Sequence, residues 1–383
     1  MIDIRHPFRF ALAFLSLALG APFAGAQVVG QPMLGLVQNA NSLVRFTTAA
    51  PGTVGTPVVV TGLAVGDTLK AIDYRPATGA LFGLATDVTN AAVRIYVINT
   101  STGAATMVGG QVALPVPGTT WDINFNPTVD RIRVVNDQDE NARLHPDLGT
   151  LAGNDTDLTP GAATVDAVAY TNPFPGATST TLYALNQTTN SLATIGGLNG
   201  TPSPNGGVVT DVGPLGVTFS GGSTGFDIAT NNAAYAVLRP SGGALTLYTV
   251  NLATGAATAA GTVGDGSLAL DDIAIVDPGL TISPPSGTYT SRQNFDIVLL
   301  ADVQGRTFAS GSVTFNGIDI SGPFAACLRP GTTATGIASF RCPNIGGVAT
   351  GPGTHTFVVR LVLTDGTVVQ RTVSWNVVAV TEP

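Results

Sequence analysis

The chain has 383 residues, of which only 10% are charged, with 47 glycines, 25 prolines and a formal net charge of −8. The acidic balance and the single lysine, Lys70, argue against nucleic acid as a partner, because phosphate binding draws most of its affinity from Lys and Arg. The shortage of Glu and Lys excludes ordinary helical surfaces, and many Val- and Thr-rich runs predict an all-β chain with turn-rich connections.

Residues 1–26 have the pattern of an export signal. Arg5 and Arg9 precede the apolar run 10–19, and residues 24–26 supply the small side chains expected before a cleavage site. The apolar run is shorter than the ~20 residues that span a bilayer, so a membrane anchor is the weaker interpretation. We therefore expect a secreted or periplasmic protein that begins at Gln27 and has no membrane span once the signal is removed.

Residues 27–277 contain five copies of an apolar, polar-or-small, apolar triplet that opens a short strand. The triplets begin at Ile72, Ile123, Val168, Phe226 and Ile273, at intervals of 45 to 58 residues. The clearest copy, residues 71–109, contains four strand-like runs in about 40 residues, which is the size and content of one propeller blade.

The two ends of this repeat region complement each other. Three predicted strands, at 33–37, 42–46 and 54–60, precede the first triplet without an opening strand, whereas the triplet at Ile273 opens a strand with no partner after it. Joining them completes a fifth sheet and removes an exposed edge. We predict a five-bladed β-propeller, with a six-bladed ring or an open β-solenoid as alternatives.

Residues 279–383 lie beyond the repeats. About 100 residues of short strands with Gly- and Pro-bearing turns are typical of an immunoglobulin-like β-sandwich, and residues 361–369 form a predicted hairpin around the Asp-Gly turn. Cys327 and Cys342 both fall in this part. In an exported protein we expect them to form a disulfide, the alternative being two unpaired buried thiols.

Residues that would carry catalysis by a serine nucleophile are poorly placed. The Gly-x-Ser-x-Gly match at 221–225 is followed by a strand rather than by the helix that this motif requires. His145 and His355 fall in different predicted domains. The sequence therefore favours no serine–histidine chemistry, and it implies no cofactor.

Five polar residues of the repeats are candidates for ligand binding: Asp73, Asn124, Asp227, Arg131 and Arg133. The first three are middle residues of triplets, where neighbouring blades cover both faces of the strand. A buried carboxylate requires hydrogen-bond donors. The competing interpretation is therefore that Asp73 and Asp227 accept backbone N–H bonds and order a loop.

Arg131 and Arg133 lie two residues apart on one predicted strand and share a face. Such a pair suits a carboxylate or phosphate group of a ligand. The alternative is that these arginines pair with local acids such as Asp130 or Asp147.

Two acidic loops, residues 136–141 and 154–157, suggest a hard cation. Asp137, Asp139, Asp155 and Asp157 lie at alternate positions, as the oxygen ligands of calcium often do. Neither loop has the glycine and terminal glutamate of a helical calcium loop. Calcium is thus a candidate ion, and solvated acidic turns are the competing interpretation.

Three segments, residues 72–81, 121–135 and 247–258, resemble the exported bacterial family known as domain of unknown function 4394. The resemblance covers roughly residues 35–276 and leaves out the tail from Gly279. It implies a β-propeller-like fold and a secreted or periplasmic setting. It brings no catalytic residues with it.

Two functions follow from these observations. The first is a non-enzymatic binding or scaffold protein, whose propeller loops present a surface to an extracellular or cell-envelope ligand. The second is an exported carbohydrate-active or other hydrolytic enzyme that uses carboxylates at the centre of the ring, such as Asp73, Asp227 or Asp272. Glycoside hydrolysis requires two carboxyl groups roughly 5 to 9.5 Å apart.

Overall fold

The computed structural model describes residues 30–87, 92–160, 165–277, 279–283, 286–290, 298–302, 308–324, 337–341 and 352–378. The predicted export signal, Cys327 and Cys342 lie outside these residues, so the signal and the disulfide stay predictions. The described chain is almost entirely β, with one short helix, α1 (Ser321–Phe324), and two 3-10 turns at Leu198–Gly200 and Pro204–Gly206. Within this part of the chain no helix has the length and apolar character needed to cross a membrane.

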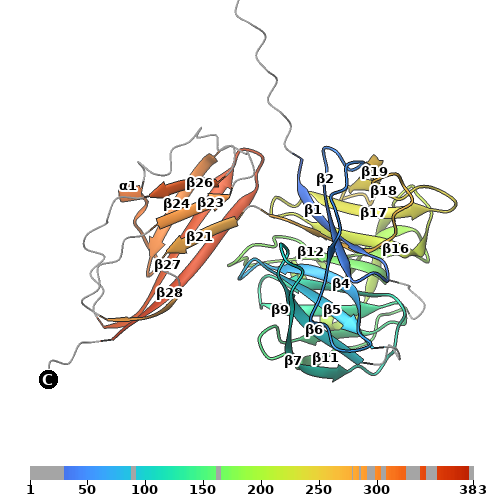
Figure 1. The fold of residues 1–383 in the computed structure, drawn as a ribbon, viewed down its shortest axis with the longest axis horizontal. Helices are drawn as coiled ribbons and strands as arrows, with labels where there is room; N and C mark the ends of the chain where they lie inside the picture. Colours follow the sequence, from blue (N-terminus) through green and yellow to red (C-terminus); the bar gives the residue numbers. More distant parts are fainter. Residues whose placement is uncertain are drawn as a thin grey trace, which may run out of the picture.

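Five four-stranded antiparallel sheets form the repeat region (Figure 1). Sheet 1 joins β20 (Leu270–Ile275) to β1 (Pro32–Val37), β2 (Ser42–Thr47) and β3 (Val58–Val59). Sheet 2 contains β4 (Thr68–Arg75), β5 (Ala80–Thr86), β6 (Ala92–Ile98) and β7 (Ala105–Ala113). Sheet 3 contains β8 (Trp121–Asn126), β9 (Arg131–Asn136), β10 (Asn141–Leu144) and β11 (Leu151–Asn154). Sheet 4 contains β12 (Val165–Tyr170), β13 (Leu182–Asn186), β14 (Ser191–Ile195) and β15 (Val209–Pro214), and sheet 5 contains β16 (Phe219–Ile228), β17 (Ala234–Pro240), β18 (Thr246–Val250) and β19 (Ala257–Thr262).

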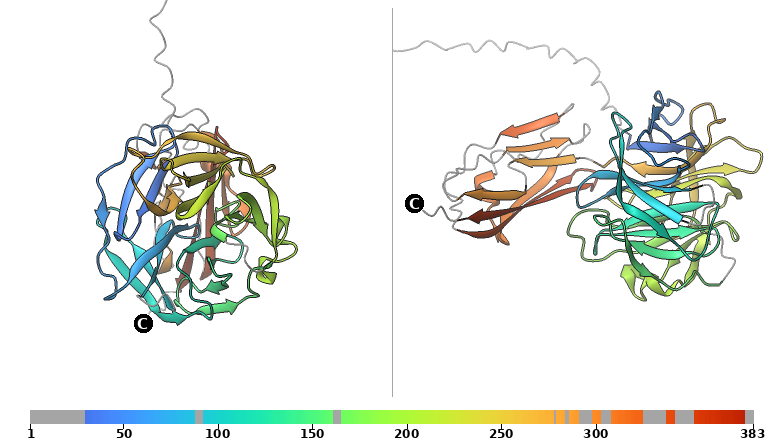
Figure 2. Two further views of the ribbon diagram at one scale, coloured as in Figure 1. Left: turned by 90° about the vertical axis from the view of Figure 1, so that its right-hand side faces the viewer. Right: turned by 60° about the horizontal axis from the view of Figure 1, so that its bottom comes forward.

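The sheets are arranged in a ring around their inner strands. β20, β4, β8, β12 and β16 carry the five triplets, and each contacts the next in this order until β16 contacts β20 (Figure 2). β1 pairs with both β2 and β20, with Gly35 opposite Ile273. The β-propeller fold is therefore confirmed, and its ring is closed by strands from both ends of the region, as the unpartnered strands predicted.

Burial decreases from the inner to the outer strand of a sheet. Every residue of β12, β13 and β14 is buried, whereas β11 and β19 on the outside are mostly exposed. Neighbouring sheets cover both faces of the inner strands, which is why the polar middle residues Asp73, Asn124 and Asp227 are buried together with the apolar residues beside them. Phe82 and Phe125, for example, meet edge-on between sheets 2 and 3 with their ring centroids 5.1 Å apart.

The residues after the ring form two further sheets. β21 (Gly279–Ser283), β23 (Val298–Asp302) and β26 (Ile337–Arg341) make one, and β22 (Gly287–Thr290), β28 (Val368–Val378), β27 (Gly353–Leu363), β24 (Phe308–Phe315) and β25 (Ile318–Asp319) make the other. The predicted hairpin is confirmed, because β27 pairs with β28 and Gly366 takes a φ of 86° in the turn. Two sheets of short strands are what a β-sandwich requires, and the immunoglobulin-like assignment stays a prediction.

Candidate functional site

Polar side chains on the inner strands tie each sheet to the next. Their oxygens accept backbone N–H groups of the neighbouring inner strand: Asp73 from Phe125 at 2.6 Å, Asn124 from Tyr170 at 2.9 Å and Asp227 from Ile275 at 2.7 Å. In each pair the acceptor is the middle residue of a triplet and the donor is the third residue of the following triplet. The interpretation that Asp73 and Asp227 accept backbone N–H bonds thus agrees with the structure.

A second set of links lies two positions earlier along the strands. Asp122 accepts the N–H of Val168 at 2.5 Å, and Asp272 accepts the N–H of Ile72 at 2.8 Å. Each acceptor directly precedes a triplet, and each donor is the first residue of the next triplet. Sequence reasoning did not identify Asp122 as an acceptor of a backbone N–H group. The position of Asp122 directly before a triplet, which Asp272 shares, could have indicated this role.

Acceptor positions that lack a carboxyl or amide group carry small residues. Ala167 and Ala169 occupy the two acceptor positions of β12, facing β16. At the next junction Gly225 precedes the triplet, and a Cβ atom there would lie only 2.6 Å from the backbone nitrogen of Ile273. β16 and β20 therefore approach each other closely, which only glycine permits at this position.

Burial controls the charge of these carboxyl groups. Asp73, Asp122, Asp227 and Asp272 are each 6% exposed or less. Burial raises the pKa of Asp227 to about 7 and holds the pKa values of Asp73, Asp122 and Asp272 well above their ordinary range. The centre of the ring therefore carries fewer negative charges than its four carboxyl groups suggest.

We expect the Asp122→Ala variant to lose about 2 kcal/mol of unfolding free energy near pH 5, because it leaves the buried N–H groups of Val168 and Ile123 unpaired. Asp122→Asn should lose less, about 1 kcal/mol, since its amide oxygen still accepts the N–H of Val168, as Asn124 accepts that of Tyr170, whereas its NH2 group cannot accept from Ile123. Urea unfolding curves of the two variants measure the difference. Equal losses in both would show that the acceptor oxygen is not what stabilises this junction.

The five inner strands surround the axis of the ring, and the space along this axis is called the channel. A cavity of about 330 Å³ lies at the end of the channel where the triplets finish. Asp73 and Asp227 lie on its channel side, and Arg371 and Leu280 come from the strands after the ring. Side chains between them include Tyr74, Phe174 and Thr230. Two of the five sequence candidates for ligand binding therefore line one cavity, together with residues that the sequence did not suggest.

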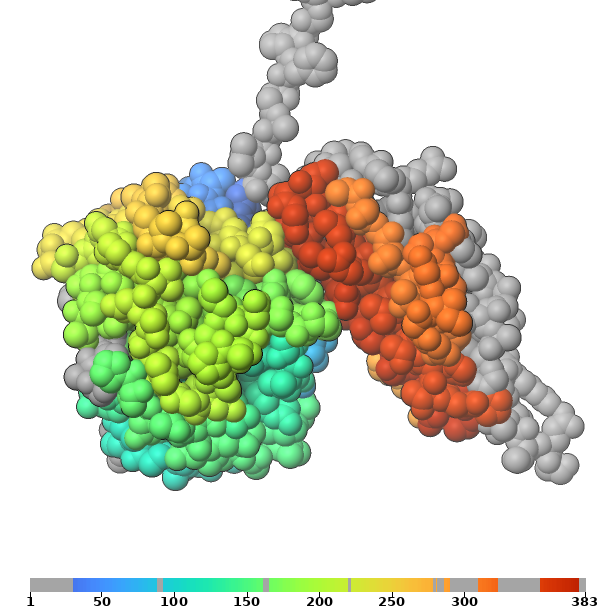
Figure 3. Space-filling model, turned by 180° about the vertical axis from the view of Figure 1, so that it is seen from behind, coloured from blue at the N-terminus to red at the C-terminus, as the bar shows by residue number. Residues whose placement is uncertain are grey.

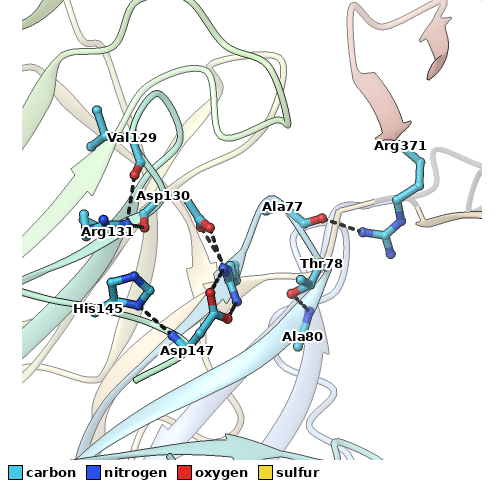
Figure 4. A network of polar contacts seen from close by, with 10 residues as sticks. Ala77, Thr78, Ala80, Val129, Asp130, Arg131, His145, Asp147 and Arg371 are labelled. Carbon is cyan, nitrogen blue, oxygen red and sulfur yellow. Dashed lines mark hydrogen bonds and ion pairs between the residues drawn. The ribbon is translucent and has the colours of Figure 1, made fainter. Parts of the chain in front are cut away.

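Direct hydrogen bonds connect β28 to the rim of this cavity. Gln370 donates its side-chain N–H to the carbonyl of Pro175 at 2.5 Å, and Arg371 donates to the carbonyl of Ala77 at 3.3 Å (Figure 4). The space-filling view shows the red strands β27 and β28 against the propeller at one end, with a gap that widens away from this contact (Figure 3). The cavity thus has one wall from the ring and one from the C-terminal sheets.

Arg75, beside the cavity, binds two acids of sheet 3. Its Nε donates to Asp130 at 2.9 Å, and its Nη1 donates to Asp147 at 2.5 Å; the two acids are labelled in Figure 4. The suggestion that Asp130 or Asp147 pairs with the side chains of Arg131 or Arg133 is therefore corrected. The structure brings Arg75 to these acids from the neighbouring sheet, a placement that sequence spacing does not reveal.

Arg131 and Arg133 have different environments. Arg133 is 1% exposed, and its guanidinium donates to Asp155 and Asn141 at 2.6 Å and to Asn205 at 2.7 Å. Arg131 donates to the backbone carbonyl of Asp130 at 2.8 Å and lies nearer the surface. Arg133 therefore has its donors engaged inside the protein, and the two arginines do not meet at one site.

The acidic loops are engaged with nearby donors. Asp137 accepts the N–H and the hydroxyl of Thr119 at 2.8 and 2.6 Å, and Asp155 forms ion pairs with Arg133 and Arg143 at 2.6 and 2.8 Å. Asp139 is half-buried and Asp157 is exposed. In the described part of the chain, no group of three or more His, Cys, Asp or Glu side chains is placed to hold a metal ion. Calcium binding stays a prediction, and it would require Asp155 to give up its arginine partners.

Comparisons with known proteins give one family match. The model of the family "Domain of unknown function (DUF4394)" matches residues 42–274. No curated protein matches the chain.

Several solved structures resemble the chain weakly. One is a protein of unknown function from Bacteroides thetaiotaomicron, with 14% identity, a TM-score of 0.41 and 66% of each chain covered. Another is an exo-β-1,3-galactanase from Phanerochaete chrysosporium, with 12% identity, a TM-score of 0.37 and coverage of 90% and 89%. An extracellular domain described as part of a hybrid two-component system of B. thetaiotaomicron has 10% identity and a TM-score of 0.34, and the alignment covers 92% of this chain but only 57% of that one. These scores are too low to carry a functional argument.

Proposed function

This chain belongs to the DUF4394 family, and we propose that it is an exported, non-enzymatic binding protein whose ligand site is the cavity at the Asp73 end of the channel. The observation that carries the proposal is the cavity itself. Its volume of about 330 Å³ lies within the range of small-molecule sites, and its walls come from two separate sets of strands. Sites of this kind occur preferentially where domains meet.

The lining favours a small polar ligand with an apolar face. Tyr74, Thr230 and Arg371 supply hydroxyl and guanidinium donors, and the half-buried ring of Phe174 supplies a flat apolar surface. Asp73 and Asp227 line the bottom of the cavity, where backbone N–H groups already engage their carboxyl oxygens. A hydroxylated molecule from outside the cell or from the cell envelope suits these groups.

The carboxyl groups at this end of the channel favour binding over hydrolysis. Asp227 accepts the N–H of Ile275 with one oxygen and that of Ile228 with the other, at 2.7 Å each, and Asp73 accepts the N–H of Phe125. A catalytic acid or base must exchange a proton with the substrate, whereas these oxygens are used to join the sheets. This arrangement supports a binding protein rather than a hydrolase.

The test is a screen of the purified chain on glycan and peptide arrays, followed by calorimetric titration of each molecule that binds. Arg371→Ala and Phe174→Ala should each weaken binding at this cavity by about tenfold or more, because each removes a contact that orders the ligand. Asp271→Asn, at the other end of the channel, is the matched control and should leave the affinity unchanged. Release of a cleaved product from any bound molecule would contradict a non-enzymatic role.

A further inference from the structure

A separate cavity of about 240 Å³ lies between sheets 3 and 4. Sheet 3 contributes Asn126 and Arg143, and sheet 4 contributes Tyr170 and the connection from β14 to β15, which carries Ser203 and Asn205. This cavity shares no lining residue with the cavity of the proposed function. None of the described residues that line it is an Asp or a Glu, whereas three aspartates line the other one. The two cavities therefore differ in chemical character.

The ion pairs beside this cavity contain one more positive charge than negative charge. Arg133 and Arg143 both bind Asp155, with N–O distances of 2.6 and 2.8 Å. In the described part of the chain, neither arginine forms an ion pair with a second acid. Asn141 and Asn205 also accept from Arg133, but their amide oxygens are neutral. One carboxylate thus serves two guanidinium groups, and the side chain of Arg143, which is 28% exposed, lines the cavity.

Side chains around the cavity also present hydrogen-bond donors that the protein does not use. The side-chain oxygen of Asn126 accepts the N–H and the hydroxyl of Thr128, and that of Asn205 accepts from Arg133. These bonds fix the orientation of both amides and leave the NH2 group of each as a donor. No described residue accepts from either NH2 group or from Nη1 of Arg143, whose other two side-chain nitrogens form the ion pair. The lining therefore has an excess of donors, which acceptor oxygens of a ligand would satisfy.

We propose that this cavity binds the sulfate or phosphate group of a small ligand. The negative charge of this group complements the surplus positive charge of the two arginines, and its oxygens accept from Arg143, Asn126 and Asn205. These donors lie on three separate elements, namely β10, the end of β8 and the connection from β14 to β15. The three or four oxygens of a tetrahedral group suit such an arrangement better than the two oxygens of a carboxylate do.

NMR titration of the full chain with sulfate, phosphate and acetate, at constant ionic strength, tests the proposal. Sulfate or phosphate should shift the backbone amide signals of residues 126–129 and 199–205 saturably and bind at least about tenfold more tightly than acetate. Arg143→Met should abolish this binding, because it removes the surplus positive charge. Saturation by neither anion, or equal binding of acetate, would overturn the proposal. Arg371→Ala should leave the shifts intact, which separates the outcome from that for the other cavity.

Asn205→Asp separates a ligand contact from a structural role. It keeps the side-chain oxygen that accepts from Arg133, so the Tm of the free protein should stay unchanged or rise. It also replaces the NH2 donor with a carboxylate oxygen, which should weaken sulfate binding at least about tenfold. Asn99→Asp is the matched control, because the oxygen of Asn99 accepts the N–H groups of Ser101 and Thr102 in a turn that does not line the cavity. A clear fall in the Tm of Asn205→Asp, or sulfate binding as tight as that of the parent chain, would contradict the assignment of Asn205 as a ligand donor.

Discussion

The unfolding free energy of the protein is expected to fall by several kcal/mol between about pH 5 and about pH 8. Four inner-strand carboxyl groups, those of Asp73, Asp122, Asp227 and Asp272, have pKa values raised mainly by burial, and that of Asp227 rises to about 7. In this window the native state therefore binds more protons than the unfolded chain does. Stability from these groups is complete below the ordinary Asp pKa of about 3.9 and is lost as the pH rises through the raised values. Asp227 alone accounts for about 3 kcal/mol of the fall between these pH values.

Urea unfolding at constant ionic strength across this pH range measures the effect. Asp227→Asn should flatten the dependence, because it removes one titrating group while its amide oxygen still accepts the N–H of Ile275, as Asn124 does for Tyr170. Asp265→Asn is the matched control, since the pKa of the exposed Asp265 is lowered by its bonds to Ser267 and this carboxylate stays ionised throughout. A stability that is constant or increases from about pH 5 to about pH 8 would contradict the prediction.

The same carboxyl groups hold the ring closed. Asp272, at the end of the repeat region, accepts the N–H of Ile72 near its beginning, and Asp227 reaches β20 from sheet 5. The Asp272 bond and the pairing of β1 with β20 join segments that are about 200 residues or more apart in sequence. Ionisation of Asp227 or Asp272 places a buried negative charge at the contacts that close the ring. The pH dependence should therefore appear as global unfolding rather than as fraying of one loop.

The fold could be predicted from the sequence because its signals are local. The triplets repeat at regular intervals, and the unpartnered strands at the two ends of the region implied closure by β1 and β20. The role of Asp73 and Asp227 as backbone acceptors could also be argued, since any strand covered on both faces must pair its polar groups.

The rest of the site depends on contacts that no local pattern records. Arg133 binds Asp155 and Asn205, which lie 22 and 72 residues away in sequence, and the loop that carries Asn205 belongs to the next sheet. The spacing of charges in the sequence suggested that Asp130 or Asp147 pairs with Arg131 or Arg133. In the structure their partner is Arg75, which the spacing did not indicate. The contact of β28 with Pro175 likewise joins residues 195 positions apart. Residues that meet across sheets in this way cannot be ranked by their separation in the sequence.

Asp155→Ala is expected to destabilise the protein by about 3 to 5 kcal/mol, because it leaves the Arg133 guanidinium buried without a counter-charge. The side chain of Asp155 is 5% exposed and that of Arg133 is 1% exposed, so water cannot replace the lost partner. Asn141 and Asn205 still accept from Arg133, but amide oxygens do not neutralise its charge. Thermal and urea unfolding at neutral pH measure the loss.

The ion pair between Arg75 and Asp147 is the matched control. Its N–O distance of 2.5 Å is as short as that of the buried pair, yet the side chain of Asp147 is 59% exposed. Asp147→Ala should therefore cost no more than about 1 kcal/mol, since water solvates an exposed partner. Combining Arg133→Met with Asp155→Leu should restore most of the stability lost in Asp155→Ala, because no unpaired charge remains buried. Equal losses in Asp155→Ala and Asp147→Ala would show that burial does not set the strength of these pairs, and the explanation of Arg133 as an internal link between sheets 3 and 4 would then fail.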